Sequence, residues 1–159
     1  MPAPRPLTFA SVGEAPAEAE RLLTGGYERR GNWDLRQVCD HCADWLAFPI
    51  DGYPPVPPWF KPALLAIRHT LGPRILHQIL REGTMRAGSP TVARTLYPPA
   101  PDPAADAAAV ERLARAADRF LAHEGKYAIS PFFGRMSREE ARGLQAIHTA
   151  HHFGFLEPK

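Results

Sequence analysis

Apolar residues recur at helical spacing through most of the chain, and prolines separate the segments in which they do so. Twelve of the 18 prolines lie from Pro49 to Pro103, which leaves three proline-free windows at residues 17–48, 104–130 and 132–157. Proline interrupts a helix interior because it lacks an N–H group and its ring clashes with the preceding turn. We therefore expect the long helices within these three windows.

Two glycines, Gly25-Gly26, divide the first window, so we expect one helix before them and one after. The first helix is predicted from about Ser11 to Thr24. Ser11 and Glu14 have the spacing of a capping box, in which the side chain of each residue accepts a hydrogen bond from the backbone N–H of the other.

The second helix has the same signal at its start, because Gln37 follows Asp34 by three residues. Pro49 and Gly52 are expected to end this helix. Between these limits, four residues at positions i, i+3, i+4 and i+7 lie on one helix face: Val38, His41, Cys42 and Trp45.

Residues 54–101 form a long connection with helical content of its own. Two stretches, about 60–67 and 75–80, have apolar residues at helical spacing, and Gly72-Pro73 lies between them. Residues 82–101 show little periodicity and are rich in glycine, serine, threonine and proline. We expect these residues to form an extended excursion on the surface.

The third long helix is expected after Asp102, which is a favoured N-cap residue and precedes a proline at the first helical position. Gly125 follows its end. Its buried stripe contains Val110, Leu113, Ala114, Ala117, Phe120 and Leu121. The final helix begins at another capping box, Ser137 with Glu140, and one of its sides carries Leu144, Ile147, His148, His151 and His152.

No alternating pattern typical of strands competes with these helices, so the sequence predicts an all-α fold in a single domain, residues 1–159. Long helices bury their apolar stripes most simply in a bundle, and one long link suits a bundle with one crossover. The predicted architecture is a four-helix bundle with a long crossover and helical insertion, residues 54–101, between the second and third helices.

Charge and composition exclude several classes of function. The chain has 159 residues with 19 Lys and Arg against 17 Asp and Glu, which gives a net charge of +2 with neutral histidines. It has no dense cationic stretch for nucleic acid and no apolar run near the roughly 18–20 residues of a membrane-spanning helix. Two cysteines are too few for a disulfide scaffold, and the N-terminus lacks the apolar core of a secretory signal. We therefore expect a cytoplasmic protein with neither nucleic acid nor membrane as its partner.

The seven histidines are the main candidates for chemistry. His148 and His152 are one helical turn apart, roughly 6 Å between Cβ atoms, so both imidazoles can reach one divalent ion. His41 lies on an apolar helix face, where a leucine or isoleucine would be ordinary. Three inward histidines without an obvious fourth ligand are the pattern of an open metal site, completed by water or substrate.

The other histidines and the cysteines have simpler interpretations. His151 is displaced by 100° from His152, and we interpret it as a residue that supports the ligands or as an alternative ligand. His69, His77 and His123 are expected in exposed or helix-terminal positions. Cys39 and Cys42 match neither a redox motif after a strand nor a complete zinc site, so Cys42 is expected in the core and Cys39 half-buried.

The assembled motifs resemble the DinB-like (DinB/YfiT) superfamily, in particular its branch of uncharacterised bacterial proteins. The matching pieces lie at residues 32–41, with the sequence Asn-Trp-Asp-Leu-Arg-Gln-Val-Cys-Asp-His, at residues 131–137, and at residues 148–152, with His-Thr-Ala-His-His. The resemblance implies a four-helix bundle with a long crossover. It also implies a divalent metal bound by His41, His148 and His152.

Characterised members of that superfamily include thiol-dependent S-transferases and a thiol-dependent isomerase. The resemblance therefore implies a metal-dependent enzyme in which the ion, expected to be zinc, nickel or iron, activates a low-molecular-weight thiol or water against a small electrophilic substrate. Two other hypotheses stay open. The protein could be a non-catalytic bundle that binds a metal structurally or forms a homodimer, or its histidines could be unrelated core residues.

Overall fold

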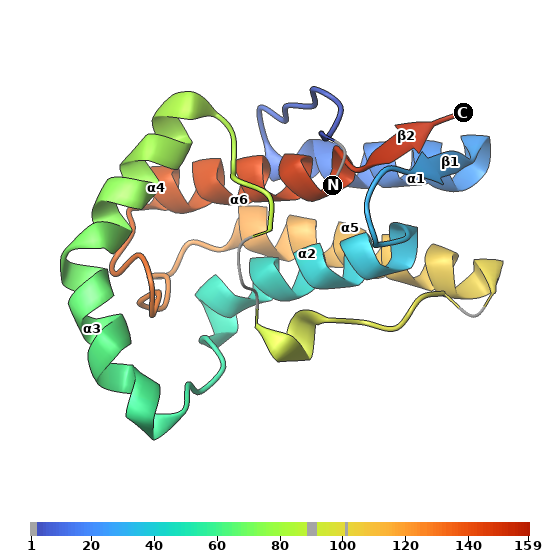
Figure 1. Ribbon diagram of the computed structural model, residues 1–159. Coiled ribbons are helices and arrows are strands. Elements are labelled where there is room, and N and C mark those ends of the chain that lie inside the picture. The colour runs from blue at the N-terminus through green and yellow to red at the C-terminus, as the bar shows by residue number, and fades with distance from the viewer. Residues whose placement is uncertain (1–2, 89–91, 101) are drawn as a thin grey trace.

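The computed structural model describes residues 3–88, 92–100 and 102–159. Most of this part of the chain is helical, which confirms the all-α class (Figure 1). Its six α-helices are α1 (Ala15–Gly25), α2 (Leu35–Asp51), α3 (Lys61–His69), α4 (Leu71–Glu82), α5 (Pro103–Ala122) and α6 (Arg138–Phe153).

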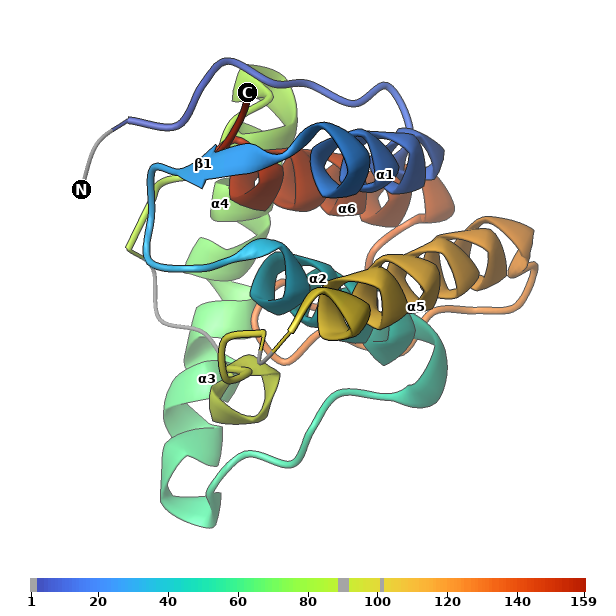
Figure 2. The same cartoon turned by 90° about the vertical axis from the view of Figure 1, so that its right-hand side faces the viewer.

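Helices α1, α2, α5 and α6 lie lengthwise beside one another, with α1 and α6 in one layer and α2 and α5 in the other (Figure 2). Figure 1 shows that α2 and α5 run in the same direction and that α1 and α6 run in the opposite direction. Two parallel neighbours need a long connection, and residues 52–102 supply it. Helices α3 and α4 of this connection lie across one end of the molecule.

One hydrophobic core joins the two layers. Each of the four lengthwise helices contributes side chains that are fully buried in it: Leu22 from α1, Leu46 from α2, Leu113 and Phe120 from α5, and Phe153 from α6. Full burial of such a side chain contributes about 1.5–3 kcal/mol, so these positions fix which face of each helix points inward.

The predicted helix starts are confirmed, with one difference. Asp34 caps α2, and Gln37 reaches back to the N–H of Asp34 at 3.1 Å. Ser137 and Glu140 form the same box at α6. At the first helix, the box formed by Ser11 opens a short 3-10 turn, Val12–Glu14, and α1 begins at Ala15 directly after it.

Pro49 does not end the second helix, contrary to the prediction. Helix α2 continues through Pro49 to Asp51 and stops at Gly52, whose φ of +99° suits glycine. Proline lacks the N–H that would bond to the carbonyl of Trp45, four residues earlier. The side-chain amide of Gln145 from α6 donates to that carbonyl instead, at 3.0 Å. A side chain of another helix therefore takes the place of the missing helical hydrogen bond.

Two short strands, which the sequence did not predict, form an antiparallel pair. Strand β1 (Tyr27–Arg29) follows α1, and strand β2 (Leu156–Pro158) follows α6. Each contains three residues, too few for a period of two to be recognised. The pair ties the chain after α6 to the end of α1, and this holds the C-terminal part of α6 in place.

The connection between α2 and α5 has the predicted helical content, in α3 and α4. However, Gly72-Pro73, which was expected to separate the two stretches, lies inside the first turn of α4. The prediction of a surface excursion at residues 82–101 is wrong in part, although residues 89–91 and 101 lie outside the described part. Thr95 ends a 3-10 turn, Ala93–Thr95, and is fully buried against α2. The carbonyl of Tyr97 then accepts a hydrogen bond from Gln37 at 2.6 Å.

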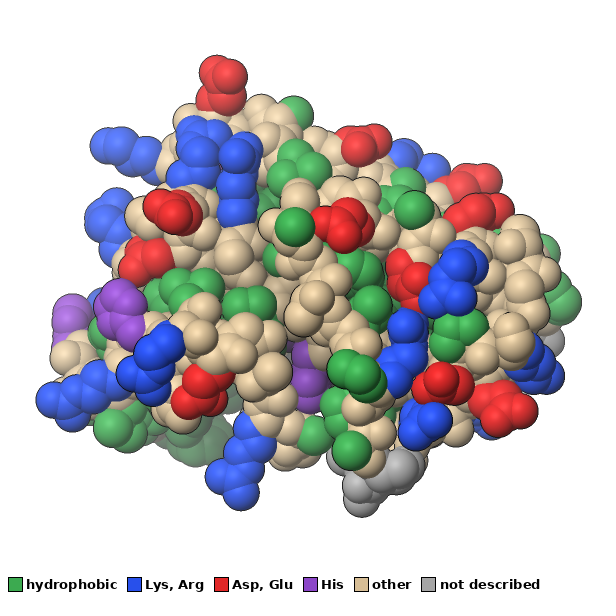
Figure 3. All heavy atoms as spheres, turned by 90° about the horizontal axis from the view of Figure 1, so that it is seen from above, with side chains coloured by type: hydrophobic (Ala, Val, Ile, Leu, Met, Phe, Trp, Pro, Cys, Tyr) green, Lys and Arg blue, Asp and Glu red, His purple; other side chains and the backbone are tan. Residues whose placement is uncertain are grey.

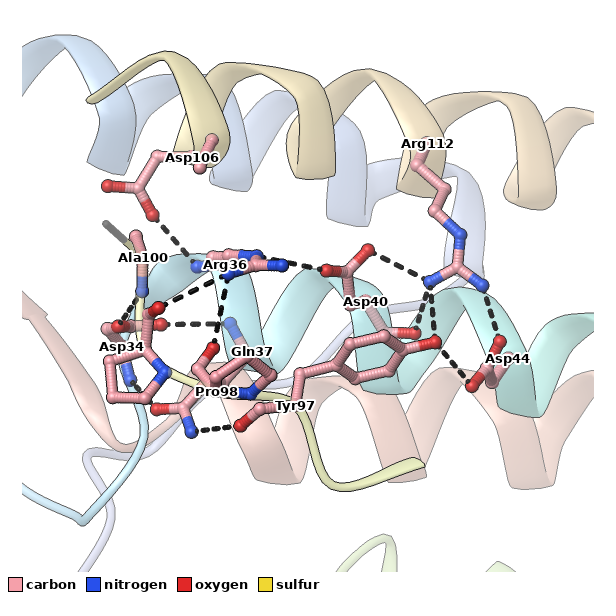
Figure 4. Close-up of polar contacts among 12 residues, drawn as sticks. Asp34, Arg36, Gln37, Asp40, Asp44, Tyr97, Pro98, Ala100, Asp106 and Arg112 are labelled. Carbon is pink, nitrogen blue, oxygen red and sulfur yellow. Dashed lines mark hydrogen bonds and ion pairs between the residues drawn. The ribbon is translucent and has the colours of Figure 1, made fainter. Parts of the chain in front are cut away.

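A polar network fastens this segment between α2 and α5 (Figure 4). The guanidinium of Arg112 on α5 donates to Asp40 at 2.9 Å and to Asp44. The hydroxyl of Tyr97 donates to the same Asp44 at 2.8 Å, and Asp34 accepts from the N–H of Ala100 at 2.8 Å. Because each partly buried charge has a partner of opposite sign or a hydrogen-bond donor, the network holds the segment in register with α2.

The face of the molecule seen in Figure 3 carries acidic and basic side chains interspersed with each other. No helix of the described residues has the length and the apolar character needed to cross a membrane.

The bond from Gln145 to the carbonyl that Pro49 leaves free gives a testable prediction. Gln145→Ala should lower the free energy of unfolding by about 1–2 kcal/mol, because it leaves a buried carbonyl without a donor. In a Pro49→Ala background the helix supplies its own N–H, so the same change should cost less. Urea unfolding of the four proteins of this double-mutant cycle measures the difference.

Gln78→Ala is the matched control, because Gln78 is exposed and its side chain bonds, within the described residues, to Glu82 on its own helix. It should change stability by less than about 0.5 kcal/mol. If Gln145→Ala lowered the free energy of unfolding equally with proline and with alanine at position 49, this explanation of how α2 continues past Pro49 would be wrong.

Candidate metal centre

Three histidines from two helices point their Nε2 atoms at one another. His41 comes from α2, and His148 and His152 are one turn apart on α6, which runs antiparallel to α2 (Figure 1). The Nε2 atom of His148 lies 3.3 Å from that of His41 and 3.2 Å from that of His152. Each residue offers a ligand atom within 4.8 Å of the other two. The structure thus brings together the three histidines that the sequence singled out.

These separations match those of ligands around a tetrahedral ion. Imidazole nitrogens bind zinc at about 2.0–2.1 Å, which places two of them about 3.3–3.4 Å apart at the tetrahedral angle. The two measured nitrogen–nitrogen distances, 3.3 and 3.2 Å, agree with this value. The cluster can therefore hold a divalent metal ion, with one tetrahedral position left for another ligand.

The pattern of hydrogen bonds also favours a cation at the centre. Nδ1 of His41 lies 3.3 Å from the carbonyl oxygen of Thr95, which can only accept, so we assign the proton to Nδ1 and a lone pair to Nε2. Nε2 of His148 faces two other Nε2 atoms, and a single proton on it can satisfy only one of them. A cation among the three nitrogens satisfies all of their lone pairs.

Burial keeps the three imidazoles neutral. It lowers the pKa of His41 to about 4, against the opposing effects of the Thr95 carbonyl and Asp44. Burial, and then repulsion from the neighbouring histidines, lowers the pKa of His148 and His152 well below the usual value. Near pH 7 all three side chains hence carry the unprotonated nitrogen that a metal requires.

Two tryptophans surround the cluster. Trp33, just before α2, stacks on His152 with ring centroids 5.1 Å apart and an angle of 10° between the ring planes. Trp45 lies one turn after His41, and its ring centroid is 5.3 Å from that of His148. Both tryptophans are half-buried, so each ring has one part against the imidazoles and another part toward solvent. In this position they cover part of the cluster and limit the directions from which a molecule can approach.

The remaining histidines do not enter the cluster. His151 places its ring edge against His152 and Phe155 and contributes no ligand atom to the group of three. It can support the orientation of His152 through this ring contact. His69 and His77 are exposed, and His123 follows the last residue of α5, as predicted.

The cysteines are core residues. Cys42 is buried as predicted, whereas Cys39, which was expected to be half-buried, is completely buried as well. Both side chains belong to the core between the helix layers, because α2 is buried on more than one face. Burial raises the pKa of Cys42 to about 12 and also raises that of Cys39, so neither thiol is an activated nucleophile.

Three residues that support the site were missed by sequence reasoning. Thr95 acts through its backbone carbonyl, which no side-chain motif reveals. Gln145 replaces a helical hydrogen bond, and only the proline at position 49 signals that a donor is needed there. Trp33 is next to the cap of α2, and its stacking on His152 depends on the antiparallel packing of α2 and α6.

The chain was compared with known protein families, curated proteins and solved structures. A family model described as a protein of unknown function (DUF1569) matches residues 1–159. The chain belongs to this family. Comparison with curated proteins and with solved structures gave no match. This description names no activity, so the functional assignment depends on the residues of the site.

The burial of the cysteines predicts that both thiols are unreactive in the folded protein. At about pH 8, where an ordinary exposed cysteine reacts readily, the native protein should not react with a disulfide reagent such as dithionitrobenzoate. In denaturant, both thiols should react. The raised pKa of Cys42 contributes stability below the pKa of an unfolded thiol, and this contribution should decrease as the pH rises above about 8.5.

Absorbance of the released thiolate counts the thiols that have reacted in each state. Rapid labelling of either cysteine in the native protein would contradict its assignment to the core. Cys42→Ser should remove one of the two thiols that react in denaturant and thus assigns the signal.

Proposed function

We propose that this protein is a metal-dependent enzyme that joins a low-molecular-weight thiol to a small electrophile or uses such a thiol to isomerise it. The observation that carries the proposal is the convergence of the Nε2 atoms of His41, His148 and His152 at distances suited to one ion. Such an ion supplies Lewis acidity, which makes a thiol or water bound to it a nucleophile near neutral pH.

The fold supports the same proposal. Helices α2 and α5 are parallel, α1 and α6 are antiparallel to them, and a long connection joins α2 to α5 (Figure 1). This order agrees with a four-helix bundle with one crossover, the architecture of the DinB-like superfamily that the motifs resemble. We propose membership of that superfamily together with the enzyme function.

The chain's own residues would position the reactants. The carbonyl of Thr95 orients His41, and the helical spacing of His148 and His152 sets the distance between their rings. Trp33 and Trp45 limit the access of water and offer apolar surface to the electrophile. Because both cysteines are buried, the thiol must come from a separate small molecule rather than from this chain.

The ligand set narrows the choice of metal. Three neutral imidazoles without a carboxylate suit zinc, nickel or iron better than magnesium or calcium, which prefer oxygen ligands. Zinc also fits the tetrahedral spacing of the nitrogens, and we propose it as the first ion to test.

A structural metal site is the second candidate function. The observation that favours it is burial, since His41 is 1% exposed and His148 is 9% exposed. In this case the ion would join α2 to α6 and stabilise the fold without reacting. A homodimer is the other non-catalytic form, and the exposed Trp59 and Leu65 on the connection would be the residues to examine for it.

Metal content tests the site. The protein, purified without an affinity tag, should contain about one divalent ion per chain by plasma mass spectrometry. His148→Ala should lose nearly all of it, because two ligands hold an ion far less tightly than three. His77→Ala, which removes an exposed histidine from α4, should retain it. Absence of metal from the wild-type protein, even after incubation with zinc, nickel and iron(II), would refute the proposal.

An activity assay distinguishes a catalytic metal site from a structural one. The metal-loaded protein should accelerate the reaction of small thiols such as glutathione or cysteine with chlorodinitrobenzene or other model electrophiles, monitored by absorbance. A chelator and His148→Ala should each return the rate to that of the uncatalysed reaction. A metal that raises the melting temperature while no thiol in the panel reacts faster would favour the structural role.

A further inference from the structure

A cavity remote from the three histidines lies where α3 and α4 meet the loop before α6. It has a volume of about 400 Å³ and lies within the usual range for small-molecule sites. Arg68 of α3 and Arg135 of the loop line it together with His69 and His77. We propose that this cavity binds a small organic phosphate, with the phosphate on the two arginines and an apolar group on the cavity floor.

The two arginines lack an acceptor within the described structure. The side chains of Arg68 and Arg135 form no hydrogen bond or ion pair among the described residues, although Arg68 is half-buried. A neighbouring cavity provides the contrast, because its arginines, Arg138 and Arg142, both donate to backbone carbonyls at the end of α5. The side-chain donors of Arg68 and Arg135 are thus available to a ligand in this cavity.

The one acidic residue of the lining forms no ion pair with either arginine within the described structure. Glu140 belongs to the capping box at the start of α6, where its carboxylate accepts from the N–H of Ser137 at 2.7 Å. Figure 3 shows basic, histidine and acidic side chains together at the left of this face, the side on which α3 and α4 lie in Figure 1. A guanidinium binds phosphate through paired N–H donors, so two of them favour a dianion over a monoanion.

The floor of the cavity is apolar. Leu76 of α4, Ile129 and Phe133 line it beside the arginines. Ile129 is 46% exposed, so its side chain is accessible to a molecule bound in the cavity. An inorganic ion alone would leave this surface in water, whereas a phosphate ester with an apolar group would cover it.

Two glycines allow the loop to pack closely against the helices. A Cβ atom at Gly72 would lie 2.0 Å from the carbonyl oxygen of Phe132, so only glycine allows α4 and the loop to approach this closely. Gly134 has a φ of +82° and lies over the side chain of Arg68. The close packing of the loop against α3 and α4 therefore places Arg135 in the lining of the same cavity as Arg68.

This site is separate from the metal centre. Glu140 and His148 are eight residues apart on α6, about 12 Å along the helix axis. None of the three metal-binding candidates lines the cavity. Binding of a phosphate here does not depend on the proposed enzyme function and can be tested without metal.

An NMR titration of the ¹⁵N-labelled full chain with phenyl phosphate tests the proposal. The amide signals of Gly72 and Gly134 should shift, and the dissociation constant should rise about tenfold or more in Arg68→Gln and in Arg135→Gln, since each loses a charge-assisted contact. Arg81→Gln is the control. It removes the same charge from α4, but Arg81 pairs with Glu82 outside the cavity, so affinity should stay within about twofold.

Two further probes test the ligand class. Inorganic phosphate should bind more weakly than phenyl phosphate, because it leaves the apolar floor uncovered. Benzenesulfonate, a monoanion with the same ring, should also bind more weakly. Equal affinity for all three probes, equal loss of affinity in Arg81→Gln, or shifts confined to other amides would each overturn the proposal. The spectrum of each variant shows directly that it is folded.

Discussion

The antiparallel contact between α2 and α6 is the constraint on which the proposed chemistry depends. A shift of either helix by one residue would rotate its histidine by about 100° and remove it from the cluster. The hydrogen bond from Gln145 to the carbonyl of Trp45 sets this register one turn away from His148. The strand pair after α6 adds a second restraint at the C-terminal end of the helix. A proline that would ordinarily weaken a helix thus creates the acceptor that aligns two helices.

The crossover has a larger role than its composition indicates. Its last part is irregular and rich in proline, yet its buried threonine and its tyrosine bond directly to α2. The network around Arg112 joins the same segment to α5. The connection therefore has two roles: its length allows α2 and α5 to be parallel, and the contacts of Thr95 and Tyr97 help to hold the two helices together. The helices of the connection, meanwhile, form one wall of the phosphate cavity.

Much of the fold and the candidate site could be predicted from local signals. Capping boxes at Asp34 and Ser137 have strong side-chain signatures, and the face that carries Val38, His41 and Trp45 has clear helical spacing. Long-range compensation could not be predicted. Proline in a helix interior predicts the end of α2 at Pro49. The prediction is wrong because Gln145, which donates to the carbonyl that Pro49 leaves free, is almost a hundred residues away in the sequence. The buried carbonyl of Thr95 and the three-residue strands likewise depend on partners that no local pattern shows.

The contact between His41 and the Thr95 carbonyl links metal binding to the order of the crossover. An ion that fixes His41 also favours the arrangement in which residues 93–95 lie on α2, and by thermodynamic reciprocity an ordered crossover raises the affinity for the ion. The order of residues 92–95 would thereby report whether an ion occupies the centre. These residues would resist proteases better in a metal-loaded protein, so degradation would distinguish it from the metal-free one.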